Sequence, residues 1–341
     1  MPQHSQFPKV LITGASGFIG SFLVDEALKK GLTVYAGIRP QSSKAFLRDP
    51  AIRFFPTDLS TPQEMLSRLQ RFHDEEGGFD FVIHNAGITK ARKREDFETV
   101  NHDCTMQFAE ALLKAGKTPE RFIFVSSLAT YGPGDDSSFE PIRIGDPQRP
   151  VSAYGRSKLE AERSLQSLTS LNTIIVRPTA VYGPRDPDFL TYFKMIGRGI
   201  DLDVTGGRQA LSFIYVKDVA RAIVGLLVAQ RCQPAYILSD GKAYERDDLA
   251  EVIAEALEKR TRRVRVPGAP MRAFVSLWEG LNGAFGSLPF LHSEKLREMS
   301  ASNWLCDSSA IWKDLQTTPQ YSLEAGVRET SAWYREQGWL K

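Results

Sequence analysis

The sequence predicts an α/β fold in which a doubly wound parallel sheet is followed by a smaller α/β part. Three observations predict it. Short apolar runs alternate with helix-like segments through the first half of the chain, a glycine-rich turn follows the first run, and the alternation loosens after Pro178. Strands that are apolar throughout and separated by helices indicate a parallel sheet covered on both faces.

Six strands are expected in the first half, because each run is short and rich in β-branched or aromatic residues. They span Val10–Ile12, Thr33–Ile38, Ile52–Pro56, Phe79–His84, Arg121–Ser126 and Thr173–Arg177. Four amphipathic segments between these strands are expected to be helices. They span Ser21–Lys30, Glu64–Phe72, Phe97–Ala115 and Ala153–Leu168.

The second half is expected to complete the first domain and to add a smaller one. We expect residues 1–180 to form the first domain, completed by about 212–240, and 181–211 and 241–341 to form a substrate-binding domain. The apolar segment Met271–Phe285 is expected to pack in a core, with a pocket wall as the alternative. The expected helices are Tyr192–Arg198, Val219–Ala229, Asp247–Lys259 and Ser322–Gln337, and the expected strands are Ser212–Val216 and Ala235–Leu238.

Composition excludes several classes of protein. The 341 residues are 42% hydrophobic and 25% charged, and 43 basic against 41 acidic residues give a net charge of +2. This balance gives no overall attraction to nucleic acid or membranes, although it allows a local basic patch. No apolar run reaches the roughly 18 residues of a membrane span, and no export signal is evident. Three widely spaced cysteines predict neither disulfides nor zinc, so we expect a cytoplasmic protein with a small-molecule partner and no metal.

A phosphate-binding turn is expected between the first strand and the first helix. Glycines at 14, 17 and 20 permit a tight turn and close approach to a pyrophosphate. The helix that follows offers free N–H groups and a positive dipole end. The strand before it and the helix after it make this glycine spacing specific for a dinucleotide. The residues expected to bind the cofactor here are Gly14, Ser16, Gly17, Phe18, Ile19 and Gly20.

Arg39 favours NADP(H) over NAD(H) as the cofactor, with NAD(H) as the alternative. An NAD site usually places a carboxylate about 20 residues after the glycine turn. Here the second strand ends at Arg39, whose guanidinium suits a 2′-phosphate. After the third strand, Asp58 is expected to accept the adenine amino group while Leu59 covers the ring. An aspartate at this place is otherwise a common helix cap.

Tyr154 and Lys158 are the candidate acid/base pair. They stand four residues apart in a predicted helix, which places them on one face. A nearby ammonium is expected to lower the tyrosine pKa from its usual value of about 10. Ser127, after the fifth strand, is placed to hydrogen-bond a substrate carbonyl. Ligands of such sheets bind beyond the carboxyl ends of the strands.

Small residues after the fourth strand are expected to let the cofactor lie against the backbone. These are Ala86 and Gly87, and His84 before them is expected to be a satisfied structural histidine. Val125 and Pro178, at the ends of the fifth and sixth strands, complete the expected cofactor-binding set.

Together these motifs resemble the extended short-chain dehydrogenase/reductases, within the NAD-dependent epimerase/dehydratase superfamily, over about residues 10–338. The resemblance implies a Rossmann domain, a smaller substrate domain and hydride transfer at the nicotinamide. It implies that Tyr154 is the acid/base, that Lys158 holds the ribose and tunes Tyr154, and that Ser127 polarises the carbonyl. It also implies a homodimer formed by the helices over 97–115 and 153–168. Asn101 matches an asparagine tied either to a proton relay or to a helix bend.

Within the family, an NAD(P)-dependent oxidoreductase acting on a hydrophobic ketone or alcohol is favoured. Leu128-Ala129-Thr130 lacks the acidic pair of dehydratases. Ala180 and Leu211 stand where nucleotide-sugar epimerases usually have Asn and Arg. The chain instead resembles dihydroflavonol-4-reductase-like and 3β-hydroxysteroid-dehydrogenase-like enzymes. The alternatives are an epimerase, with Arg185 or Arg208 binding a diphosphate, and a non-catalytic NAD(P)-binding sensor.

Overall fold

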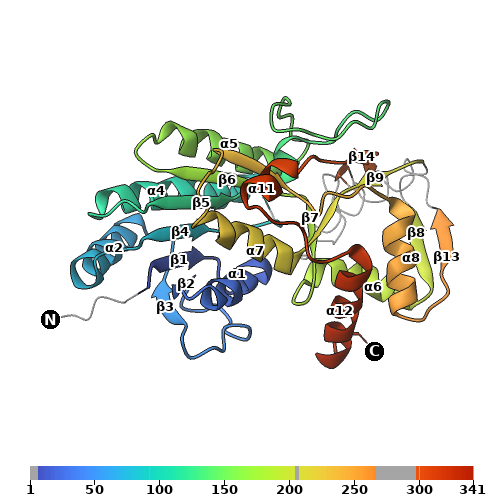
Figure 1. Cartoon of the computed structure of the whole chain (residues 1–341), viewed down its shortest axis with the longest axis horizontal. Helices are drawn as coiled ribbons and strands as arrows, with labels where there is room; N and C mark the ends of the chain where they lie inside the picture. The colour runs from blue at the N-terminus through green and yellow to red at the C-terminus, as the bar shows by residue number, and fades with distance from the viewer. Residues whose placement is uncertain (1–6, 92, 204–206, 266–296, 299, 341) are drawn as a thin grey trace.

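Seven parallel strands form the central sheet of this computed structural model, which describes residues 7–91, 93–203, 207–265, 297–298 and 300–340 (Figure 1). The strand order is β11-β6-β5-β4-β1-β2-β3, so the winding reverses between β1 and β4. A reversal of this kind is where doubly wound sheets bind ligands. The strands are β1 (Lys9–Thr13), β2 (Thr33–Ile38), β3 (Arg53–Pro56), β4 (Phe81–His84), β5 (Arg121–Val125), β6 (Thr173–Pro178) and β11 (Ala235–Leu238).

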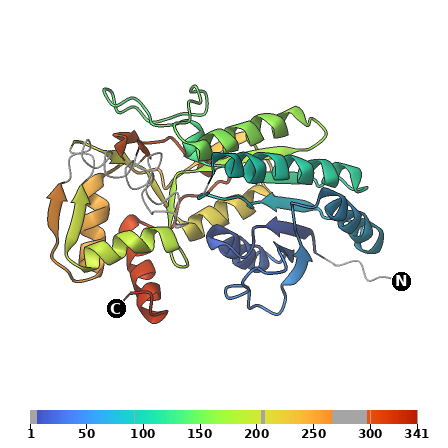
Figure 2. The same ribbon diagram turned by 180° about the vertical axis from the view of Figure 1, so that it is seen from behind.

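Helices cover both faces of this sheet, which confirms the predicted Rossmann-like α/β fold. Alternate residues of each strand enter different cores: Val10 and Ile12 pack on one side and Leu11 on the other. One core lies under α1 (Phe18–Lys29), α7 (Val216–Leu226) and α11 (Ser309–Asp314). The other lies under α2 (Pro62–Glu76), α4 (Cys104–Lys114) and α5 (Ala153–Ser167), on the opposite side in Figures 1 and 2.

The helix predicted over 97–115 is longer and is interrupted by a π-helical turn. It comprises α3 (Arg94–Phe97), η1 (Glu98–Asp103) and α4. Such π turns interrupt regular helices and often lie at functional sites. Asn101 lies within this turn and is fully buried.

The remaining elements gather beyond the carboxyl ends of the main strands, at the right of Figure 1. Their core is rich in aromatic residues, including Tyr182, Phe193 and Tyr334. Short strands pair as β7–β10, β8–β13 and β12–β9–β14. These elements are β7 (Ala180–Tyr182), α6 (Pro187–Gly197), β8 (Ile200–Asp203), β9 (Ala210–Leu211), β10 (Phe213–Tyr215), β12 (Tyr244–Glu245), α8 (Arg246–Ala256), β13 (Arg262–Arg265), β14 (Asn303–Trp304) and α12 (Leu323–Glu336).

The strand predicted over 212–216 is shorter in the structure and lies outside the main sheet. The segment 212–216 does not join the main sheet, because β10 pairs with β7 and Val216 already begins α7. The chain returns to the main sheet through α7 and β11, which pairs with β6. The predicted segment Met271–Phe285 lies outside the described residues. None of the described helices is long and apolar enough to cross a membrane.

The docking of α12 gives a test of the fold. A Cβ at Gly326 would lie 2.8 Å from Cδ2 of Tyr215 and would also overlap the hydroxyl of Tyr182. We predict that Gly326→Ala destabilises the protein by about 1–3 kcal/mol, because the side chains of a packed core do not yield freely. Gly145→Ala is the control, since a Cβ there meets nothing within 4 Å. Urea unfolding measures both variants, and equal midpoints would show that α12 does not dock as described.

Candidate active site

The residues predicted to bind the cofactor lie along one edge of the main sheet. The parallel strands β3, β2, β1, β4, β5 and β6 are consecutive neighbours, so their carboxyl ends form a single row. The residues at or just after these ends are Asp58, Arg39, Gly14, Ala86, Gly87, Val125, Ser127 and Pro178. Topology therefore brings together residues that are spread over more than a hundred positions in the sequence.

The glycine turn has the geometry of a phosphate cradle. Gly14 has φ +65°, and a Cβ on it would lie 2.9 Å from the backbone of Ala86. A Cβ on Gly20 would lie 2.8 Å from the carbonyl carbon of Gly14. No side chain caps α1 at Gly17, which leaves the first N–H groups of the helix for an outside acceptor. Ser16, Phe18 and Ile19 are half-buried around this turn, so the residues present fit a dinucleotide.

Arg39 and Asp58 lie near each other at the ends of β2 and β3. Arg39 is exposed, and no carboxylate follows it in the position that an NAD site usually uses. Hydrogen bonds from Ser60 hold the pKa of Asp58 below its usual value, and the positive charge of Arg39 contributes. Asp58 does not cap α2, since Thr61 precedes that helix. Leu59 is half-buried against the core under α2 and α4.

Lys158 is held at the base of the site by the end of β5. The hydroxyl of Ser152 accepts a hydrogen bond from the Gly155 N–H at 3.1 Å and so fixes the start of α5. Lys158 Nζ donates to the Val125 carbonyl at 2.9 Å and lies 4.6 Å from the ring centre of Phe124. Burial lowers the pKa of Lys158 to about 8. Its ammonium form therefore predominates at neutral pH and is lost as the pH rises above 8.

Tyr154 meets Ser127, but its acidity differs from the expectation. Burial raises the pKa of Tyr154 to about 12, opposed by its hydrogen bond with the Ser127 hydroxyl and reinforced by the carboxylate of Glu298. The expectation that Lys158 lowers this pKa is wrong in this structure. The lysine ammonium is directed to the carbonyl of Val125, and burial outweighs any attraction. Tyr154 is therefore a phenol at neutral pH.

Asn101 connects the loop after β4 with the helix that carries Tyr154. Its side-chain oxygen accepts from the Ile88 N–H at 2.8 Å, and its amide donates to the Ile88 carbonyl at 3.1 Å. The same amide donates to the Ser157 hydroxyl at 3.0 Å. A Cβ on Gly87 would lie 2.9 Å from the Asn101 oxygen and 3.3 Å from Lys158 Nζ, so only glycine fits there. Asn101 thus both occupies the helix distortion and supports the site.

His84 is a satisfied buried histidine, as expected. Thr13 Oγ1 accepts from the Ala86 N–H at 3.1 Å and lies 2.9 Å from His84 Nδ1, which accepts its proton when the ring is protonated on Nε2. Thr105 donates to the Asn101 carbonyl, so it accepts from His84 Nε2 at 3.0 Å. These roles fix the neutral Nε2–H tautomer. Burial lowers the pKa of His84 to about 3, and the charge of Lys158 adds to this.

A buried ion pair beneath the site was not anticipated from the sequence. Arg177, in β6, donates two hydrogen bonds to Glu162 at 2.9 and 2.8 Å, and both side chains are almost wholly buried. Glu162 also accepts from Ser126 and Gln148, and it opposes the lowering of the Lys158 pKa. Glu162 follows Lys158 by four residues in the same helix, which places both on one face. This spacing was the only sequence signal that Glu162 lies near the site.

In the described residues, no cluster of three His, Cys, Asp or Glu side chains suits a metal.

Comparison with known proteins identifies the family. The sequence profile described as "NAD dependent epimerase/dehydratase family" matches residues 10–237. The chain belongs to this family. Its fold and its glycine turn agree with the extended short-chain dehydrogenase/reductases, and the family is NAD-dependent.

Named relatives in this family perform different reactions. A ceramide reductase of Caulobacter vibrioides is 30% identical over 340 residues, covering 97% of this chain and 96% of the relative. A UDP-glucose 4-epimerase of Vibrio cholerae is 28% identical over 278 residues, covering 77% and 80%. A 3 beta-hydroxysteroid dehydrogenase/Delta 5-->4-isomerase of Mycobacterium tuberculosis is 22% identical over 347 residues, covering 97% and 91%. Membership therefore indicates NAD-dependent chemistry without selecting one reaction.

The neutral state of His84 predicts a pH dependence of stability. Its folded-state pKa of about 3 is below its ordinary value of 6.5, so the unfolded chain binds more protons. Stability conferred by neutral His84 is thus complete above pH 6.5 and is lost as the pH falls from there towards 3. We predict that the stability difference between wild type and His84→Gln shrinks across this window. Urea unfolding at stepped pH measures it, and a constant difference would contradict the assignment.

Proposed function

We propose that this family member is an NADPH-using reductase that converts a hydrophobic ketone into a secondary alcohol. The observation that carries the proposal is the placement of Tyr154, Ser127 and Lys158 together at the sheet edge that also holds the glycine turn. Tyr154 keeps its proton at neutral pH, so it is available to donate it to a carbonyl oxygen. Alcohol oxidation would instead need a base.

Each residue of the site has a role that its contacts support. The reduced nicotinamide supplies a hydride to the carbonyl carbon when bound. Ser127 donates a hydrogen bond to the carbonyl oxygen as negative charge develops there. Tyr154 delivers the proton to that oxygen, so hydride plus proton give the alcohol. Lys158 adds a positive charge beneath the site and offers N–H groups to the nicotinamide ribose. Asn101, through Ile88 and Ser157, holds the loop and the helix at fixed separation.

The cofactor assignment rests on Arg39. Its exposed guanidinium at the end of β2 offers paired donors to a 2′-phosphate, and the glycine turn and the start of α1 offer backbone N–H groups to the pyrophosphate. The adenine would lie by Asp58 and Leu59.

The residues at the two positions where epimerases usually bind a diphosphate favour a hydrophobic substrate. Ala180 and Leu211 provide no charge. Arg185 is 3.0 Å from Asp25 and packs on Phe22, so it is already engaged within the protein. The ceramide reductase relative is named for a lipid, which agrees with an apolar substrate.

A nucleotide-sugar epimerase is the second candidate. The relative from Vibrio cholerae favours it, and Arg208 would be the nearest available diphosphate ligand. Arg208 pairs with Glu245 at 2.9 Å, but that pair is exposed and could be exchanged for a phosphate. An epimerase retains its cofactor and shows no net consumption of NADPH, which separates the two reactions.

Removal of the Tyr154 hydroxyl tests the proposed chemistry. We predict that Tyr154→Phe lowers kcat for ketone reduction by about 10²–10⁴-fold, because the proton donor is lost. NADPH oxidation with a panel of apolar ketones measures it, and Tyr321→Phe, which removes a phenol outside the site, serves as the control. Full activity of Tyr154→Phe would rule out the assigned role.

Reversal of the charge at Arg39 tests the cofactor. We predict that Arg39→Asp weakens NADPH binding roughly 10–100-fold relative to NADH, since a charge-assisted hydrogen bond contributes about 1.5–3 kcal/mol. Arg48→Asp is the matched control, because Arg48 is exposed in the same loop. Fluorescence titration of both cofactors measures the preference, and an unchanged preference in Arg39→Asp would contradict the assignment.

A further inference from the structure

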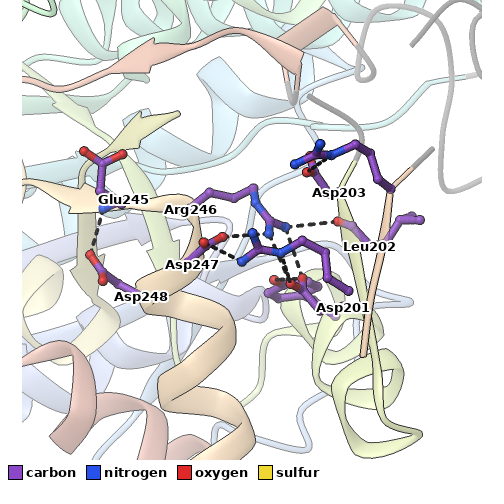
Figure 3. A network of polar contacts seen from close by, with 10 residues as sticks. Asp201, Leu202, Asp203, Glu245, Arg246, Asp247 and Asp248 are labelled. Carbon is purple, nitrogen blue, oxygen red and sulfur yellow. Dashed lines mark hydrogen bonds and ion pairs between the residues drawn. The ribbon is translucent and has the colours of Figure 1, made fainter. Parts of the chain in front are cut away.

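The two-stranded ribbon of β8 and β13 presents one face on which charges are paired. Its strands are parallel, with Asp201 opposite Arg263 and Asp203 opposite Arg265. Arg263 and Arg265 form ion pairs with these aspartates at 3.5 and 3.2 Å. Arg246, the first residue of α8, donates two hydrogen bonds to Asp201 at 3.1 Å (Figure 3). The charges on this face are therefore paired with one another, and Arg246 joins the face to α8.

The opposite face of the ribbon combines apolar side chains with a cation. Because side chains alternate along a strand, Ile200, Leu202, Arg262 and Val264 point away from the paired face. Ile200 and Val264 are each 40% exposed, although both are large and hydrophobic. The ribbon lies at the end of the molecule opposite the N-terminus (Figure 1). Its outer face is thus apolar, basic and peripheral.

Four exposed cations lie in the segments that adjoin this ribbon. Arg198, Lys259, Arg260 and Arg262 form no side-chain ion pair or hydrogen bond with another described residue. They are close in space: the Arg262 N–H donates to the Gly199 carbonyl at 2.8 Å, and a Cβ on Gly199 would lie 3.2 Å from the Arg260 carbonyl oxygen.

The acidic side chains nearest in sequence do not neutralise this cluster. The exposed carboxylates of Glu255 and Glu258 leave an excess of positive charge. One of these cations lies at the C-terminus of α8, where a positive charge is stabilised by the helix dipole. The dipole does not explain Arg260 and Arg262, which lie along the ribbon.

This combination distinguishes among anionic partners. A nucleic acid would use the cations but would gain nothing from exposed Ile200 and Val264. A lipid surface of negative charge uses both, since basic side chains meet the headgroups while apolar ones reach the acyl boundary. The net charge of +2 does not reveal this local excess, because 41 acidic residues nearly balance the 43 basic ones over the whole chain.

We propose that the β8–β13 ribbon docks the protein reversibly on an anionic lipid membrane. Arg198, Lys259, Arg260 and Arg262 contact the headgroups, and Ile200 and Val264 enter the boundary. This inference rests on the proposed function, because an apolar ketone partitions into membranes and a docked reductase meets it there. It differs from the expectation that membranes are not partners, and it relies on the local basic patch that the composition allows.

Co-sedimentation with vesicles tests the docking surface. The probes are vesicles of equal parts phosphatidylglycerol and phosphatidylcholine, compared with phosphatidylcholine alone, over a series of salt concentrations. We expect binding to the anionic vesicles that weakens with salt. Each basic side chain near such a surface contributes roughly fivefold, so the triple variant Lys259→Gln, Arg260→Gln and Arg262→Gln should bind roughly 100-fold more weakly. The control variant is Lys30→Gln, Arg71→Gln and Arg231→Gln, which removes the same charge from exposed sites elsewhere.

The outcomes separate this proposal from the proposed reaction. No binding of the wild type to anionic vesicles, or equal weakening by both triple variants, would overturn it. Ile200→Ser with Val264→Ser should also weaken binding several-fold, and an unchanged affinity would contradict lipid insertion. The ribbon triple variant should keep its kcat/KM for a short water-soluble ketone and lose rate only on a ketone dissolved in vesicles. If no ketone is reduced while vesicles are still bound, the reaction is wrong and the docking surface stands.

Discussion

One buried chain of hydrogen bonds sets the geometry on which the site depends. It passes from Thr13 at the end of β1 through His84 in β4 and Thr105 in α4 to Asn101 in the π turn. The side chain of Asn101 continues it to Ser157 in the helix that carries Tyr154 and Lys158. The phosphate turn and the acid/base pair are therefore connected through groups that water does not reach, and every member has a defined donor or acceptor role.

Burial also sets the electrostatics of the site. The phenol of Tyr154 stays protonated because its surroundings disfavour a phenolate, and Ser127 only partly offsets this. Lys158 loses basicity for the same reason, while Glu162 opposes that loss from within the ion pair with Arg177. The protein thus arranges one neutral acid and one marginal cation at the same edge. In the proposed reaction, the neutral phenol gives its proton to the carbonyl oxygen while the lysine charge lies beneath it.

Much of the fold could be predicted from the sequence, because buried strands of a parallel sheet are apolar throughout. The predicted strands over 33–38 and 235–238 agree with the structure residue for residue. Short strands such as β8 and β13 were missed because four residues show little periodicity. The strand predicted over 212–216 pairs with β7 outside the main sheet, and sequence alone does not show which strands pair. The pKa of Tyr154 was misjudged because burial, and the approach of Glu298 from more than a hundred residues away, arise only in the folded chain.

The most direct test of the account follows the hydride itself. The protein would be incubated with an apolar ketone and NADPH deuterated at the transferring position of nicotinamide C4, and the product would be examined by mass spectrometry. The account predicts a secondary alcohol that carries deuterium on the former carbonyl carbon, with one NADPH consumed for each alcohol formed. A nucleotide sugar that changes configuration without consuming NADPH, while no ketone acquires deuterium, would contradict it.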